Sequence, residues 1–172
     1  MIYFISDLHF GHRNLLKYER TEFADVNEHD DHIVHSINTV VSDADTLYIL
    51  GDVFNLDKIH LIRGRKILML GNHDHKKLDE YYNYFSCVFE YPIYYNKKIL
   101  LSHHPHPVSG GVLNVHGHLH SKKLDSPNHF CVSAKNIDYK PVSIDELNNM
   151  AEGLFEGTKY GTEWYSSLVA DQ

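Results

Sequence analysis

The feature that most constrains the fold is a set of five short apolar runs, each followed directly by Asp, Asn or His residues. The runs are residues 2–5, 46–50, 66–70, 99–101 and 112–115. Each run predicts a buried β-strand. Scattered histidines would not favour one end of every strand, whereas in layered α/β proteins the functional site lies beyond the carboxyl ends of the strands. We therefore expect the polar clusters to form one site.

The central cluster is Gly71-Asn72-His73-Asp74, which follows the third run. Gly71 permits a sharp turn where that strand ends. Taken alone, this segment is equally typical of a polar turn in which Asp74 caps the next helix. It is not alone, because similar clusters follow the other runs: Asp7-Leu8-His9, Gly51-Asp52, His103-His104 and His116-Gly117-His118-Leu119-His120.

In this order, the clusters resemble the five motif blocks of the calcineurin-like metallophosphoesterases, and they span most of the chain, from Asp7 to His120. The resemblance implies a phosphoesterase with a four-layer α/β/β/α sandwich of two mixed sheets flanked by helices. The order of the predicted elements fits, because strands alternate with helices in the first half and strands predominate in the second.

The residue types in these clusters predict a metal centre. Carboxylate, imidazole and amide oxygen suit borderline to hard divalent ions. Seven candidates are too many for one tetrahedral zinc and suit two ions roughly 3.5–4 Å apart. In extended chain, positions i and i+2 project from the same side, so Asp7 with His9, and His118 with His120, could each face one point. Asp52 is the natural bridge, because a carboxylate has two oxygens to share.

The resemblance assigns these ligands to two ions, with manganese expected first and iron, nickel, zinc or cobalt as alternatives. Asp7, His9, Asp52 and His120 would hold the first ion, and Asp52, Asn72, His103 and His118 the second. His103 is chosen over His104 by register with the family. The chain departs from the family pattern at Ser102, where glycine is usual.

His73 resembles the general acid of the family, which protonates the leaving alkoxide after a hydroxide activated by the two ions attacks phosphorus. Asp74 would fix the tautomer of His73 through a hydrogen bond. The alternative is that His73 is a structural histidine beside the ligands. Candidates for contacting the substrate phosphate are His12, Arg13, Asn14 and Arg20, each of which could instead belong to a solvated loop.

Little chain remains to build a cap over the site once the strands and helices are assigned. We therefore expect an open site that acts on small or nucleotide-like phosphodiesters rather than on phosphoproteins. The alternatives are a phosphomonoesterase, protein phosphatase or nuclease of the same fold, or a non-catalytic interaction module. A module of that kind would be expected to lack ligands, and all the candidates are present. A net charge of −7 argues against a general nucleic-acid-binding surface.

The 172 residues predict a single domain, 1–172, in which residues 153–172 form a tail that docks or frays. No apolar stretch approaches the roughly 18 residues of a membrane helix, and no basic signal region precedes the first strand, so we expect a cytoplasmic protein without a membrane partner. Two cysteines make no disulfide framework and fit a reducing compartment. The sequence leaves the oligomeric state open.

Helical spacing of apolar residues predicts an amphipathic helix over residues 27–41, with His29, His32 and His35 on its solvated face. Shorter helices are expected within residues 10–20, 55–62, 75–85 and 143–150. In the last of these, Ser143 and Glu146 could form a capping box.

Overall fold

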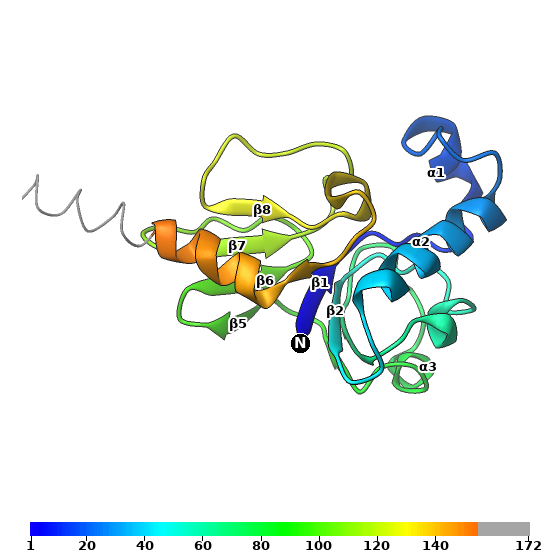
Figure 1. The fold of residues 1–172 in the computed structure, drawn as a ribbon, viewed down its shortest axis with the longest axis horizontal. Helices are drawn as coiled ribbons and strands as arrows, with labels where there is room; N and C mark the ends of the chain where they lie inside the picture. Colours follow the sequence, from blue (N-terminus) through cyan, green and yellow to red (C-terminus); the bar gives the residue numbers. More distant parts are fainter. Residues whose placement is uncertain (155–172) are drawn as a thin grey trace, which may run out of the picture.

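Two mixed β-sheets packed face to face form the centre of the molecule, with helices packed against them (Figure 1). The computed structural model describes residues 1–154, so the predicted tail lies outside the described residues from residue 155 onward. This architecture confirms the predicted fold class. Among residues 1–154, no helix is long and apolar enough to cross a bilayer.

The first sheet has the strand order β4-β3-β2-β1-β9. All neighbours in it run parallel except β9, which is antiparallel to β1. The strands are β1 (Ile2–Ile5), β2 (Thr46–Leu50), β3 (Arg65–Met69), β4 (Cys87–Phe89) and β9 (Val142–Ser143). Apolar runs that the sequence predicts as strands therefore form the middle of this sheet.

The second sheet has the order β5-β6-β7-β8, with β5 antiparallel to β6 and the remaining pairs parallel. Its strands are β5 (Ile93–Asn96), β6 (Ile99–Ser102), β7 (Leu113–His116) and β8 (His129–Cys131). The two sheets meet just past the ends of β1 and β8: Ser6 N donates to Val132 O at 2.9 Å, and Ala134 N donates to Ser6 O at 2.9 Å. This junction brings strand ends of both sheets to one place.

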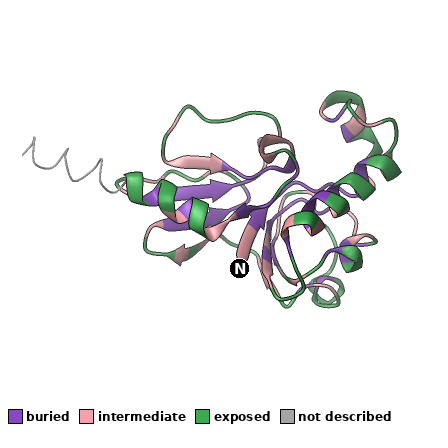
Figure 2. Ribbon diagram, in the orientation of Figure 1, coloured by how far each residue is buried: buried purple, intermediate pink, exposed green. Residues whose placement is uncertain are grey.

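Helical segments pack on the outer face of the first sheet. They are α2 (Val26–Val40), η1 (Ile59–Leu61), α3 (Leu78–Tyr82) and η2 (Ala134–Ile137). Helix α1 (Arg13–Tyr18) lies away from that sheet (Figure 1). Helix α2 begins at Asp25, whose carboxylate accepts from the N–H groups of Asn27 and Glu28. Its inner face buries Ile33 and Ile37 in a core shared with the sheet, and its outer face is exposed (Figure 2).

A second core lies between the sheets and includes the helix over residues 144–154. Leu147 and Ala151 of that helix join residues of both sheets in this core. The predicted capping box is confirmed: Ser143 N donates to Glu146 Oε2 at 2.8 Å, and Glu146 N donates to Ser143 Oγ at 3.3 Å. The box fixes the direction in which the helix leaves β9.

Three helical predictions need correction. Residues 55–62 contain only the short turn η1, because the Asn55 side chain accepts from Asp57 N and forms a local turn instead. The helix expected within residues 75–85 is shortened to α3. His29 was expected on the solvated face of α2, but it is fully buried, whereas His32 and His35 are exposed as expected.

Candidate metal centre

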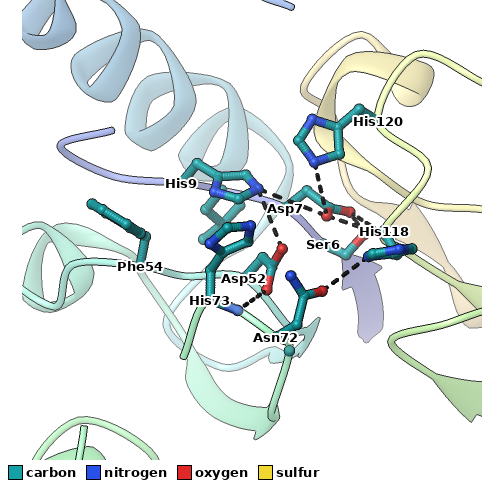
Figure 3. Close-up of polar contacts among 12 residues, drawn as sticks. Ser6, Asp7, His9, Asp52, Phe54, Asn72, His73, His118 and His120 are labelled. Carbon is teal, nitrogen blue, oxygen red and sulfur yellow. Dashed lines mark hydrogen bonds and ion pairs between the residues drawn. The ribbon is translucent and has the colours of Figure 1, made fainter. Parts of the chain in front are cut away.

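Residues that follow strands of both sheets converge on two groups of potential metal ligands (Figure 3). The first group is Asp7, His9, Asp52 and His120, and the second is His103, His104 and His118. Within each group, one ligand atom from every residue lies within 4.8 Å of the others. The first group has the same four members that the sequence predicts for the first ion.

Asp52, a member of the first group, also faces the second group. Each of its two carboxylate oxygens points to a different group. Its Oδ2 is 3.4 Å from His9 Nε2, and its Oδ1 is 3.4 Å from His103 Nε2. This is the placement that a bridging carboxylate requires. The His73 N–H donates to Oδ1 at 2.9 Å and so helps to fix the orientation of the carboxylate.

Asn72 completes the second group. Its Oδ1 is 2.9 Å from both His103 Nε2 and His118 Nδ1. His103 Nδ1 lies 2.9 Å from Leu50 O, which can only accept, so this nitrogen carries a proton and the other nitrogen faces Asn72. His103 is 4% exposed and aimed at Asp52, whereas His104 is exposed, although its ring also lies within the second group. The geometry favours His103 and keeps His104 within reach.

The candidate ligands lie in strained backbone just beyond the strands. Asp7, His9, Asp52, His118 and His120 all have positive φ, between 49° and 69°. The predicted reason for the i, i+2 pairing, an extended chain, is therefore wrong: each pair is brought together by left-handed residues after the strand has ended. Such residues cost free energy and concentrate at functional sites. Hydrogen bonds from Asp7 N to Gly51 O and from His9 N to Asp52 O, both 2.9 Å, hold the first pair.

Two motif glycines allow the ends of β2 and β3 to approach each other. Gly51 has φ +91°, and a Cβ there would collide with His103 Nδ1 and lie 2.8 Å from Gly71 Cα. A Cβ on Gly71 would lie 2.5 Å from Asp52 N and collide with the Asp52 carboxylate. These positions need glycine because the backbone itself forms the floor beneath Asp52 and His103.

The electrostatics of the centre suit a cation. Asp7 and Asp52 are fully buried, and within residues 1–154 their side-chain ion pairs are with histidines. Burial lowers the pKa of His9 to about 2, so its imidazole is neutral. Burial opposes the charge of Asp52, but the hydrogen bond and charge of His103 outweigh it and hold the pKa of Asp52 below its ordinary value. Buried carboxylates are costly unless they are paired or bind metal.

Three buried atoms of the first group reinforce this fit. Asp52 Oδ2, His9 Nε2 and His120 Nδ1 have no hydrogen-bond partner in the part of the chain that the structure describes. The Asp7 carboxylate, in contrast, accepts from Ser6 Oγ at 2.6 Å and from His118 N at 3.0 Å. Unsatisfied buried polar atoms are rare and call for an explanation, and a divalent ion bound between these side chains would supply one.

His73 borders the first group without belonging to it. Its half-buried ring lies 5.3 Å from the ring of His9, between centroids, and points into the space beside Asp52 (Figure 3). The predicted partnership with Asp74 is wrong. The Asp74 carboxylate instead accepts from four backbone N–H groups, those of Gly71, Asp52, Val53 and Phe54. Asp74 therefore holds the strand-end backbone and does not orient His73.

The four residues predicted to contact the substrate phosphate lie in different environments. His12 lies at the centre, with its Nδ1 3.3 Å from His9 Nδ1. Arg13 and Asn14 are exposed on α1, and Arg13 lines a groove of about 480 Å³ with Lys17 and Phe23 that contains no member of either ligand group. The proximity of His12 is consistent with a role at the site, whereas the exposure of Arg13 and Asn14 leaves theirs as predictions.

The prediction for Arg20 is wrong, because its side chain is fully buried. The guanidinium donates to Leu8 O at 3.1 Å and to Asp7 O, and its Nη1 lies 2.6 Å from His29 Nε2. His29 Nδ1 is 2.7 Å from Asp30, which accepts from Gly11 N. These contacts hold the backbone of the Asp7–Gly11 loop in place from the buried side. A sequence signal existed, since His29 precedes Ile33 and Ile37 at helical spacing and so shares their buried face.

Phe54 is a residue at the site that the sequence did not single out. It follows Asp52 by two positions, is 38% exposed and stacks on His12, with ring centroids 4.4 Å apart and planes at 12°. The apolar neighbours Val53 and Leu56 enter the core, so the outward position of Phe54 could not be read from periodicity.

Taken together, the fold and the site define a mixed α/β protein with a histidine- and carboxylate-rich candidate metal centre where its two sheets meet. No protein-family model matches the chain. It is 36% identical to the uncharacterized protein MJ1445 of Methanocaldococcus jannaschii, over 88% of this chain and 91% of that protein. It is 32% identical to the gene 66 protein of Mycobacterium phage L5, over 71% and 78%. The chain belongs to the family of these two proteins.

A solved structure shares the fold. It is that of the Aquifex aeolicus protein of unknown function AQ665, which matches with a TM-score of 0.71 and 28% identity. The match covers 87% of this chain and 98% of that one.

Proposed function

We propose that this protein is a metal-dependent phosphoesterase that hydrolyses small or nucleotide-like phosphodiesters. The observation that carries the proposal is the position of Asp52, whose two oxygens face two separate groups of candidate ligands at 3.4 Å each. A single ion would need no carboxylate shared in this way. Two adjacent divalent ions are the arrangement that many phosphoryl-transfer enzymes use.

The types of ligand atom indicate which class of ion would bind. Oxygen and imidazole ligands without a thiolate favour manganese, with iron, nickel, zinc and cobalt as alternatives. The first ion would be held by Asp7, His9, Asp52 and His120, and the second by Asp52, Asn72, His103 and His118. When bound, two such ions supply a nucleophile from water at neutral pH and neutralise charge on the phosphoryl group.

The protein's own residues position the reaction. The buried carboxylates and imidazoles would hold the two ions at the junction of the sheets, and this sets the place where the phosphoryl group can bind. His73, close to the first group but outside it, would give a proton to the oxygen of the leaving group. Its backbone N–H donates to Asp52, so His73 and the bridging carboxylate keep a fixed position relative to each other.

The proposed setting is the cytoplasm. Both cysteines are free, with Cys131 buried and Cys87 half-buried, which is compatible with a reducing compartment. The acidic net charge favours small substrates over long nucleic acids.

The test is metal dependence combined with a substrate panel. Protein stripped by a chelator should lose activity on a bis-aryl phosphate and regain it on titration with about two equivalents of Mn²⁺. The same preparation should show lower kcat/KM on an aryl monophosphate and on a phosphopeptide. Full activity of the stripped protein would refute the proposal, and a preference for the monoester would replace the diesterase by a phosphomonoesterase.

A further inference from the structure

We propose that Phe54, backed by His12, forms a subsite for a planar aromatic group, a nucleobase or an aryl ring, in the leaving group of the substrate. This inference rests on the proposed function and adds the chemistry that the leaving group must have. A bulky aromatic residue with φ +69° is unusual, because the left-handed region suits glycine and asparagine.

The strained turn at Phe54 is built and held. Asn55 N donates to Val53 O at 3.0 Å, which closes a three-residue turn centred on Phe54. Phe54 N also donates to Asp74 Oδ1 at 3.2 Å. The same three-residue turn recurs at His118, a candidate ligand with φ +69°, where Leu119 N donates to Gly117 O at 2.9 Å. Turns of this kind are rare and strained, and strain held in this way is typical of functional positions.

The turn exposes a ring that the core could have buried. Val53 and Leu56, on either side, pack into the core behind the first sheet, whereas the ring of Phe54 stays partly exposed. One side of the ring stacks against His12. Aromatic rings prefer such offset stacks, and the stack can be extended by a further planar ring.

The position of Phe54 and His12 determines which part of the substrate they would contact. The ring of Phe54 lies 6.4 Å from that of His73 and 6.5 Å from that of His9 (Figure 3). The ring of His12 lies 5.8 Å from that of His73. The proposed proton donor therefore borders both Phe54 and His9, a candidate ligand of the first ion. A leaving group that receives a proton from His73 would lie beside the ring of Phe54.

The experiment compares two methyl phosphodiesters that differ only in the shape of the leaving alcohol, benzyl alcohol or cyclohexylmethanol. The two alcohols are similar in size and acidity, so bond breaking itself does not separate them. With Mn²⁺ present, the wild-type protein should show a kcat/KM about tenfold higher for the benzyl diester, as expected of one stacking contact. A methyl diester of adenosine, followed by release of the nucleoside, shows whether a nucleobase is taken in preference to a simple aryl ring.

Variants test whether the preference for the benzyl diester depends on Phe54. Phe54→Asn, which tolerates the left-handed turn, should bring the ratio of the two kcat/KM values close to one, whereas Phe54→Tyr should keep it. Tyr91→Asn removes another exposed aromatic, 78% exposed, which lines a pocket with His104 and not with His73, and should leave the ratio unchanged. Mn²⁺ binding by each variant checks that the site is folded.

The outcomes are distinct. Equal wild-type rates on the two diesters, or a ratio that survives Phe54→Asn in a protein that still binds Mn²⁺, would overturn the aromatic subsite and leave the phosphodiesterase standing. Hydrolysis of neither diester, nor of the bis-aryl phosphate, would overturn the proposed function and the subsite with it.

Discussion

At the scale of single residues, the proposed proton donor, His73, is distinct from the proposed metal ligands. His73 is in neither ligand group, yet its backbone is bonded to Asp52 and its ring borders His9. His73→Ala should therefore keep most of the metal and lose roughly 10²–10⁴ in kcat on alkyl diesters, which need a protonated leaving group. Activated aryl diesters should lose much less. Metal content and the two rates, measured on one preparation, check this, and loss of metal would make His73 a ligand.

Arg20 is predicted to act on the first ion through the backbone. It donates to the carbonyls of Asp7 and Leu8, and Arg20→Met would leave both without their buried donor. We expect a loss of about 3 kcal/mol in the free energy of unfolding, at roughly 1–3 kcal/mol per unsatisfied group. Mn²⁺ affinity should fall at one site only. Arg13→Met, an exposed neighbour on α1, is the control. Equal weakening of both sites would show that Arg20 serves general stability.

The residue types at the centre could be predicted from the sequence, because each cluster directly follows an apolar run. The roles of Asp74 and Arg20 could not. Their partners are backbone groups, N–H for Asp74 and carbonyls for Arg20, and the sequence carries no record of which backbone groups remain unpaired in a fold. The residues with left-handed backbone could not be predicted either. A positive φ is common for glycine, but aspartate, histidine and phenylalanine give no such indication in a sequence.

At the scale of elements, Glu22 ties the loop between α1 and α2 to η2. It accepts from Lys135 Nζ at 2.7 Å and from Tyr139 Oη at 2.6 Å. Burial acts to raise the pKa of Glu22, but these two hydrogen bonds outweigh it and lower the pKa to about 2. The folded state therefore favours the charged form. Its stabilising contribution is complete above the ordinary pKa, near 4.5, and is lost as the pH falls toward 2.

Glu22→Gln should accordingly destabilise the protein at pH 7, and the difference from wild type should shrink as the pH falls below about 4.5. Urea unfolding at pH 7, 5, 4 and 3 measures it. In a Lys135→Met background the pH dependence of the same substitution should be weaker, because one of the two hydrogen bonds is already absent. A difference that stays constant from pH 7 to 3 would show that the charge of Glu22 contributes nothing to stability.

The boundaries of elements were predictable where local signals were strong. β2 and the helix over residues 144–154 have clear signals, namely an apolar run and a capping box. Residues 55–62 had helical spacing, but a side chain of the turn, Asn55, bonds to the backbone two residues on and stops the helix from starting there. Local competition of this kind decides short elements, whereas tertiary packing decides long ones such as α2.

At the scale of the whole molecule, the site exists because the two sheets join. The bridge between Ser6 and Ser133 aligns the end of β1 with the end of β8, and residues after β1, β2, β6 and β7 then share one location. The sequence predicts strands that end in ligands, but not which strands become neighbours, because that pairing spans more than a hundred residues. The family resemblance predicted a sandwich, and the structure supplies the register that makes the two groups adjacent.

The most direct measurement of the central claim is a calorimetric titration of metal-free protein with Mn²⁺, comparing wild type with Asp52→Asn. Because Asp52 turns one oxygen to each group, the wild type should bind two ions and the variant should bind both more weakly. Asp31→Asn, an exposed carboxylate of α2, is the control. A variant in which only one site weakens, or neither does, would contradict the bridging role of Asp52.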